Sequence, residues 1–151
     1  MQLKPGLQSD GSWFVPVMPV RKDQSIPSKN SKFGRCRNPA YREAQKAFRS
    51  YLIGFPDPLP RIYAKSGTKK RAAVLDLPNV RLDMTLYAEG TSRMDTVTAY
   101  DFLNDVLEGI GYKDDWQVWG GFIQKRPHSG ISGVQFKLTE ISQGEVLGRV
   151  L

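Results

Sequence analysis

Six acidic side chains gather in one short stretch of this chain, from Arg93 to Val118, which carries a single interior base. The whole protein has 151 residues and a net charge of +7, so this stretch is acidic within a basic protein. The six are Asp95, Asp101, Asp105, Glu108, Asp114 and Asp115. Carboxylates are the ligands that Mg²⁺ prefers in proteins, and a carboxylate-bound Mg²⁺ promotes phosphodiester hydrolysis. The stretch therefore predicts a site that holds Mg²⁺ against phosphate.

A helix is expected to position these acids. Apolar residues between Ala99 and Ile110 recur at the spacing of one helical face. The opposite face carries three of the acids, Asp101, Asp105 and Glu108. We expect Thr98 and Asp101 to form an N-terminal capping pair, and Gly109 and Gly111 to end the helix. The acids therefore gather on and around one helix.

The ends of this helix supply the best ligand candidates. Asp95 precedes the helix, and Asp114 follows its return loop, with Asp115 as a third candidate. An alternative interpretation makes Asp95 a simple helix cap and the Asp114–Asp115 pair a solvated turn. We expect Asp105 and Glu108 to belong to a solvated helix face.

The same stretch resembles the core of the RusA-type Holliday junction resolvases, which are small phage and bacterial endonucleases. The closing segment YKDDWQV is its most specific part. Ten residues fall in register with the family pattern without a gap: Asp95, Asp105, Leu107, Gly109, Tyr112, Lys113, Asp114, Asp115, Gln117 and Val118. The resemblance implies that Asp95 and the Asp114–Asp115 pair are the catalytic carboxylates.

The chain departs from the family pattern beside Asp95. Val97 stands where the family has a second Asp, Asp101 stands where it has a Lys, and Thr98 replaces an Asn. One hypothesis makes Asp101 a migrated ligand, because position 101 lies one helical turn from position 97. The catalytic set is then Asp95, Asp101, Asp114 and Asp115, and the metal ligands are Asp95, Asp101 and Asp114. The rival hypothesis makes Asp101 a cap beside a remnant site.

Basic residues dominate the first half of the chain. Between Arg21 and Arg71, fourteen bases face three acids, a local net charge of +11. Such a basic region beside an acidic island suits DNA binding, although a high isoelectric point alone is also compatible with an ordinary surface. The expected DNA contacts are Lys29, Lys32, Arg35, Arg37, Arg42, Lys46, Lys69, Lys70 and Arg71. Phe33, within the basic run, either stacks at a branch point or packs on the core.

Chain length and the order of the expected strands and helices predict one α+β domain over residues 1–151, with peripheral tails at 1–12 and 142–151. Hydrophobic residues make up 40% of the chain, and no apolar run has the roughly 20 residues of a membrane span. The start lacks the apolar segment of a signal peptide. One Cys excludes an internal disulfide, and one His with one Cys excludes the usual zinc sites. We expect a cytoplasmic protein. The resemblance implies that it acts in a bacterial host cell and that a phage encodes it.

Periodicity predicts a small mixed sheet with helices packed on it, and the resemblance to RusA-type resolvases implies a RusA-like fold of this kind. The expected strands cover 13–20, 80–88, 116–123 and 133–141, the third with a bulge at Gly120–Gly121. A helix is expected over 40–53, with Asn38 as its cap and Pro39 at its first position. The segment 124–133 is expected to form a basic turn, in which His128 is either solvated or contacts phosphate.

Two functions remain open. The first is a Mg²⁺-dependent endonuclease, able to use Mn²⁺, that resolves Holliday junctions in DNA recombination and repair. It would act as a homodimer, because two sites are needed to cut two opposed strands. The second is a junction-binding protein that has the same fold and weak or lost nuclease activity.

Overall fold

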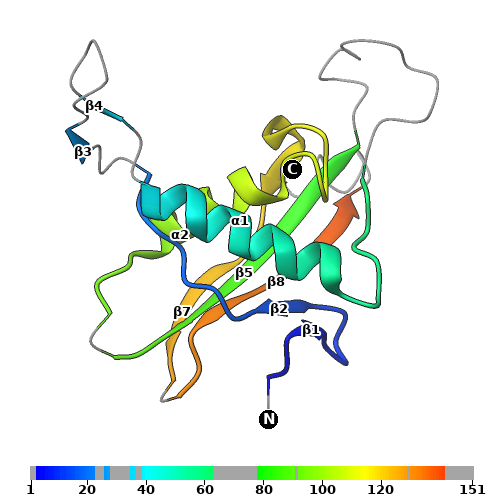
Figure 1. Ribbon diagram of the computed structural model, residues 1–151. Helices are drawn as coiled ribbons and strands as arrows, with labels where there is room; N and C mark the ends of the chain where they lie inside the picture. The colour runs from blue at the N-terminus through cyan, green and yellow to red at the C-terminus, as the bar shows by residue number, and fades with distance from the viewer. Residues whose placement is uncertain are drawn as a thin grey trace, which may run out of the picture.

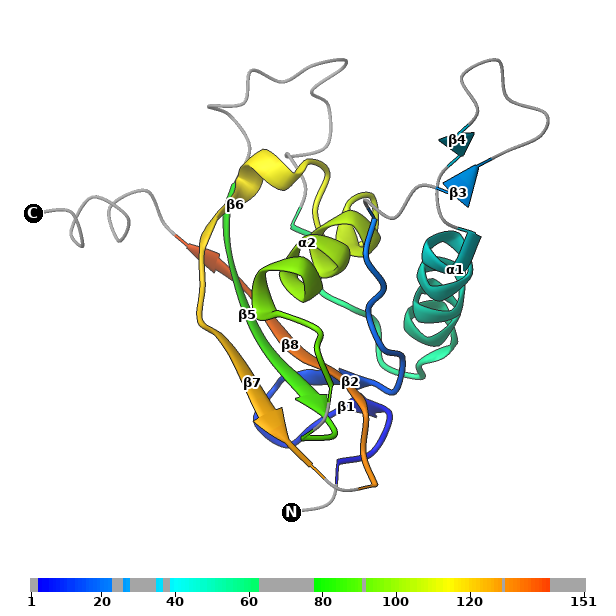
Figure 2. The ribbon, with the colours of Figure 1, turned by 90° about the vertical axis from the view of Figure 1, so that its left-hand side faces the viewer.

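The computed structural model describes residues 3–22, 26–27, 35–36, 39–62, 78–90, 92–128 and 130–141. In this part of the chain a mixed six-stranded sheet carries two helices on one face (Figures 1 and 2). The predicted α+β class is therefore confirmed. The helices and the helical turn are α1 (Pro39–Gly54), α2 (Thr96–Leu107) and η2 (Asp115–Gln117). The strands of the sheet are β1 (Gly6–Leu7), β2 (Trp13–Val15), β5 (Asn79–Ala88), β6 (Val118–Gly120), β7 (Ile123–Pro127) and β8 (Gly133–Ile141).

The long strand β5 lies at the centre of the sheet. Its side chains alternate as predicted, with Val80, Leu82, Met84, Leu86 and Ala88 all buried. On one side β5 pairs antiparallel with β8, from Asn79 opposite Ile141 to Tyr87 opposite Gly133. Strands β2 and β1 extend the sheet beyond β8. The buried row of β5 faces the helices and forms the floor of the core.

The other side of β5 pairs parallel with β6 and β7, which together form one edge of the sheet. Helix α2 connects β5 to this edge, as a parallel pairing requires. The prediction of one strand over 116–123 is wrong in part, because Trp116 and Gln117 belong to η2. The kink at Gly120–Gly121 is confirmed, since the strand breaks there. A Cβ on Gly121 would lie 1.7 Å from the Leu82 carbonyl oxygen.

Two further segments differ from the prediction. Residues 124–127, expected in a basic turn, belong to β7 (Ile123–Pro127), because their backbone completes the parallel ladder with β5. Strand β2 ends at Val15 rather than Val20, since Pro16 has no N–H to continue the ladder. Strand β1 lies within the expected peripheral segment 1–12 and pairs with β2. A separate pair of short strands, β3 (Ile26–Pro27) and β4 (Arg35–Cys36), lies in the basic segment.

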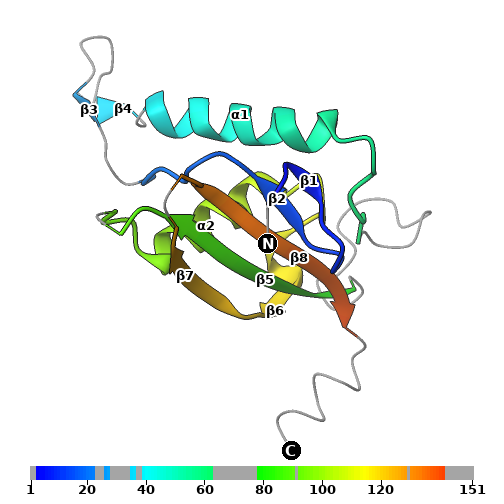
Figure 3. The same ribbon diagram turned by 90° about the horizontal axis from the view of Figure 1, so that it is seen from below.

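Helix α1 covers α2 and the β2 end of the sheet (Figure 3). It begins at Pro39, as predicted, while its expected cap Asn38 lies outside the described residues. Its buried side chains are Tyr41, Phe48 and Leu52. The Phe48 and Phe102 rings meet edge to face with centroids 5.8 Å apart, which joins the two helices across the core. No described helix is both long and apolar enough to cross a membrane.

Candidate metal centre

Helix α2 places its acidic residues at the surface because its opposite, apolar face is buried in the core. Its buried side chains are Ala99, Phe102, Leu103, Val106 and Leu107, which pack on the sheet and on α1. The predicted amphipathic pattern is thereby confirmed. Burial of this face fixes the rotation of the helix and turns Asp101, Asp105 and Glu108 away from the core.

Asp95 is the N-cap of α2. Its Oδ1 accepts a hydrogen bond from the Thr98 backbone N–H at 2.7 Å, and its Oδ2 accepts from the Thr98 hydroxyl at 2.9 Å. These bonds, with the charge of Arg21 nearby, lower the pKa of Asp95. The predicted capping pair of Thr98 and Asp101 is therefore wrong, because the helix begins three residues earlier than that pair requires. The alternative role of Asp95 as a helix cap is confirmed.

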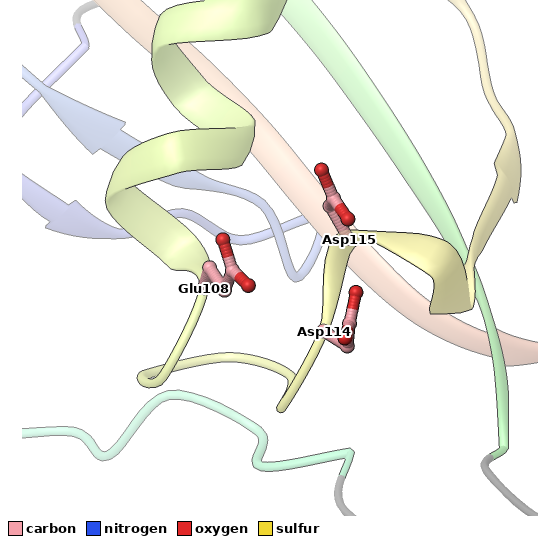
Figure 4. A group of neighbouring side chains, drawn as sticks. All are labelled: Glu108, Asp114 and Asp115. Atoms are coloured by element: carbon pink, nitrogen blue, oxygen red, sulfur yellow. The ribbon is translucent and has the colours of Figure 1, made fainter. Parts of the chain in front are cut away.

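The acids converge at the opposite end of α2. Glu108 follows the last helical residue, and its carboxylate lies near those of Asp114 and Asp115 on the turn that leads into η2 (Figure 4). One carboxylate oxygen from each residue lies within 4.8 Å of the others, so the three could hold a metal ion. Twelve helical residues separate Asp95 from this cluster, a distance of about 20 Å along the axis. Asp95 and Asp114 therefore belong to different ends of the helix.

Gln117 fixes the turn that carries Asp114 and Asp115. Its buried side-chain oxygen accepts from the backbone N–H groups of Lys113 at 2.7 Å and Asp114 at 3.0 Å. Its amide nitrogen donates to the carbonyl oxygens of Ile62 at 2.7 Å and Pro78 at 3.1 Å. The Asp114 side chain accepts from the Trp116 N–H and, in a capping box with Gln117, also from the Gln117 backbone N–H. One buried amide thus holds the acidic turn against two other segments.

The electrostatics of the cluster show an excess of negative charge. Desolvation raises the pKa of Glu108, and the charges of Asp115, Asp114 and Asp105 raise it further. Desolvation also raises the pKa of Asp115, with added contributions from a hydrogen bond to Asp114 and from the charges of Asp114 and Asp105. Glu108 and Asp115 are therefore harder to ionise beside the neighbouring carboxylates, and a bound cation would relieve this repulsion.

A pocket of about 400 Å³ adjoins the cluster along α2. Its lining includes Asp101, Asp105 and Asp115, so the structure brings these predicted residues to one place. Asp105 is not simply solvated, as we expected, because its carboxylate accepts hydrogen bonds from the Tyr41 hydroxyl and from Lys22. The Lys22 Nζ lies 3.2 Å from Asp105 Oδ2 and places one cation in an otherwise acidic pocket.

The expected DNA contacts are described only in part. Arg42 and Lys46 are exposed on α1. The backbone of Arg35 lies in β4, and the remaining predicted contacts lie outside the described residues: Lys29, Lys32, Arg37, Lys69, Lys70 and Arg71. Phe33 also lies outside them. The His128 ring contacts the Tyr87 ring edge to face, with centroids 6.1 Å apart.

Two residues of the site were missed as functional candidates. Glu108 was assigned to a solvated face, although its place as the last acid of α2, six residues before Asp114, puts it beside the returning turn. Gln117 was noticed only as part of the YKDDWQV segment, and its burial depends on Ile62 and Pro78, which are distant in sequence. Gln117 stands between Trp116 and Val118, and nothing in this local sequence indicates that its side chain is a buried anchor.

Replacing Glu108 by Gln should raise the Tm of the metal-free protein at pH 7 by about 1–2 °C, because one repelling charge is removed from a solvent-screened cluster. A divalent cation held by the cluster, at ten times its Kd, would add about 1.4 kcal/mol to the stability of the parent, or about 3–6 °C to its Tm, and this gain should shrink in Glu108→Gln. Thermal melts with Mg²⁺ and with EDTA measure both effects. Glu89→Gln, which removes an exposed acid elsewhere, is the control.

The advantage of Glu108→Gln should also depend on pH. Because the pKa values of Glu108 and Asp115 are raised on folding, the folded protein binds protons more tightly than the unfolded chain in mild acid. Acidification from pH 7 towards the ordinary Glu value of 4.5 protonates Glu108, whose pKa is raised, and so removes its share of the repulsion. The Tm difference between parent and variant should therefore disappear at acid pH. A lower Tm for metal-free Glu108→Gln at pH 7 would contradict this account.

Comparison with models of known protein families and with curated protein sequences finds no match for this chain.

Proposed function

We propose that this protein is a Mg²⁺-dependent endonuclease that cleaves branched DNA, of the type that resolves Holliday junctions in recombination and repair. The observation that carries this proposal is the convergence of Glu108, Asp114 and Asp115 in a protein of net charge +7. Three converging carboxylates, whose charges help to raise the pKa values of Glu108 and Asp115, are a suitable ligand set for a hard divalent cation. The resemblance of the same stretch to RusA-type resolvases supports the proposal.

The dimensions of the cluster suit a small divalent cation. Opposite oxygen ligands of Mg²⁺ lie about 4.2 Å apart, given a bond length of about 2.1 Å. Adjacent ligands lie about 3.0 Å apart, so side-chain rotations would have to bring the three carboxylate oxygens, all within 4.8 Å of one another, closer together around the ion. When bound, Mg²⁺ or Mn²⁺ supplies an activated water and neutralises charge on the leaving oxygen.

The chain's own residues would contribute substrate binding around this point. Lys22 offers a positive charge to a phosphate in the pocket that Asp101 and Asp115 line. It would take the place of the family Lys, which Asp101 replaces in this chain. The basic residues between Arg21 and Arg71 would bind the flanking DNA backbone. We propose a homodimer, because two opposed strands of a junction must be cut.

A second candidate is a junction-binding protein with weak or no cleavage. The observation that favours it is the position of Asp95, the first acid of the family motif. Both of its carboxylate oxygens are engaged by Thr98, at the end of α2 remote from Glu108. Val97, which replaces the second family Asp, is 62% exposed and supplies no ligand. On this reading the protein recognises branched DNA through its basic surface alone.

The test is a cleavage assay with an end-labelled four-way junction, in Mg²⁺ and in EDTA. The expected result is a pair of symmetric cuts in opposed strands with Mg²⁺ and none with EDTA. An Asp115→Asn protein, purified in the same way, controls for a contaminating nuclease. A fully paired duplex of the same length controls for structure selectivity.

The outcomes separate the two candidates. Cleavage in Mg²⁺ that is lost with Asp115→Asn supports the nuclease. A band shift specific to the junction without cleavage supports the binding protein. Equal and weak binding to junction and duplex, with no cleavage, would contradict both candidates. Sedimentation at a mass of one chain, with and without junction DNA, would contradict the homodimer.

A further inference from the structure

Three large aromatic side chains are exposed along the η2–β6–β7 edge of the sheet. Trp116, Trp119 and Phe122 have exposed fractions of 69%, 60% and 55%. They are spaced three residues apart, and we call them the aromatic edge. Aromatic side chains gain more than other residues from burial, and a group of exposed ones marks an interaction surface. The aromatic edge is therefore a candidate binding surface.

The backbone under these rings is held firmly. The Phe122 N–H donates to Asp83 Oδ1 at 2.8 Å, and the Phe122 carbonyl accepts from the Met84 N–H at 2.7 Å. Gly121 packs so closely on Leu82 that the position has no room for a Cβ. At the other end, Trp116 lies between Asp115 and the buried Gln117 of the clamped turn. The rings are thus presented to solvent by a fixed framework.

Part of the aromatic edge faces the side of the sheet opposite the helices. Val118 pairs with Val80 and packs on the core, so strand alternation turns Trp119 to the opposite face. Phe122 lines a cavity of about 300 Å³ on that face. Arg126 and Lys137 line the same cavity together with Asp10 and Asp83, so its lining carries charges of both signs. Among the described elements no helix covers this face (Figure 2).

The aromatic edge begins at the acidic cluster. Trp116 directly follows Asp115, and its backbone N–H donates to Asp114 Oδ1 at 3.1 Å. A ligand that spans both features needs a phosphate, which a metal ion can bridge to carboxylates, and flat π faces, which stack on indole and phenyl rings. Nucleotides combine these two groups in one molecule. A protein partner would use the aromatic rings but would leave the adjoining acids without a role.

We propose that the aromatic edge is a stacking surface for unpaired bases of a DNA strand whose backbone passes the acidic cluster. This inference rests on the proposed function and specifies its substrate. Bases inside a duplex have no free face. The preferred substrate is therefore DNA with unpaired nucleotides beside the cleavage point.

Tryptophan fluorescence offers a direct test, because the exposed Trp116 and Trp119 report on stacking whereas Trp13 is 3% exposed. The probe is a single-stranded oligothymidylate, which has no branch to cleave, titrated both in Mg²⁺ and in EDTA, with a duplex of equal length beside it. The expected result is quenching by the single strand and weak quenching by the duplex. Trp119→Ala and Phe122→Ala should each weaken single-strand binding about tenfold and duplex binding much less.

Two further variants make the result specific. Trp119→Phe retains an aromatic ring and should restore most of the binding. Tyr51→Ala removes a 40% exposed aromatic from α1 and should change nothing. Circular dichroism verifies that each variant is folded. We expect all of them to fold, because the replaced rings are exposed and contribute little to the core.

Several outcomes would overturn the proposal. One is single-strand binding by Trp119→Ala and Phe122→Ala at the affinity of the parent. Another is a change in Trp fluorescence with protein concentration alone, together with loss of a dimer in Trp119→Ala, which would assign the aromatic edge to a second copy. The same experiments distinguish failure of the stacking surface from failure of the nuclease. Quenching by the single strand without junction cleavage in Mg²⁺ would support the stacking surface and contradict the nuclease. Junction cleavage without quenching would support the nuclease and contradict the stacking surface.

Discussion

Junction cleavage in Mg²⁺ is expected to fall about 100-fold or more when Asp115 is replaced by Asn, with junction binding unchanged or tighter. An amide is nearly isosteric with the carboxylate but is a poor ligand for Mg²⁺, and removal of a negative charge reduces repulsion of phosphate. The same loss is expected for Asp114→Asn and Glu108→Gln, because the three side chains share one point. Single-turnover cleavage rates and band-shift affinities measure the two quantities separately.

Asp95→Asn is the matched control for this series. It makes the same chemical change at the other end of α2, and Asn is also an effective N-cap, so the helix should remain formed. We expect it to cleave at close to the parental rate. A loss equal to that of Asp115→Asn would instead place the metal where the family motif has its first acid, and would contradict a centre built on Glu108.

Asp101→Asn distinguishes the two hypotheses for the altered motif. Asp101 lines the pocket beside Asp115, as a ligand that has moved by one helical turn would. Migration predicts a clear loss of cleavage for Asp101→Asn and little gain from Val97→Asp. A remnant site predicts that cleavage is already near zero and appears only when Val97→Asp is combined with Asp101→Lys.

The second large effect is expected at Gln117. Replacing Gln117 by Leu should lower the free energy of unfolding by about 3 kcal/mol and the Tm by about 6–12 °C. Leu has a similar volume, but it leaves two backbone N–H groups and two carbonyl oxygens without their partner at a buried position. Chemical denaturation with an unchanged m value would give this difference directly.

Gln124→Leu is the control for that experiment. The Gln124 side chain makes one described hydrogen bond, to the Thr85 hydroxyl at 3.0 Å, so its loss should cost less than about 1 kcal/mol. Gln117→Leu should also lose much of the Mg²⁺-induced rise in Tm, since the acidic turn is no longer held in place. Equal destabilisation by both variants would show that Gln117 is not a special anchor.

Much of the fold could be predicted from the sequence, because its main signals are local. The alternation in 80–88 and the helical spacing around Ala99 depend on which faces are buried, and both are confirmed. Strand β7 was missed because IQKRP has little alternation of its own. Its pairing with β5 is decided by the crossover through α2, which no local pattern reports.

The candidate site was predictable in part. Asp114 and Asp115 were identified, and the structure places them in the cluster. The helix start was misplaced because Thr98 with Asp101 and Asp95 with Thr98 both fit capping patterns, and only the packing of α2 selects the second. Glu108 could not be chosen over Asp95 from the sequence, because the turn that brings Asp114 back to the helix end depends on the distant carbonyl groups that bind Gln117.

The break between β6 and β7 has a consequence for solubility. An edge strand with exposed aromatic rings is the kind of segment that pairs with the same edge of another molecule and starts aggregation. Here the regular ladder of the edge lasts three residues in β6, stops at Gly121 and resumes in a strand that carries Lys125 and Arg126 and ends at Pro127. Irregular backbone, positive charge and a proline each oppose edge-to-edge growth. The chain can therefore expose large rings on a sheet edge without offering a continuous template for amyloid-like assembly.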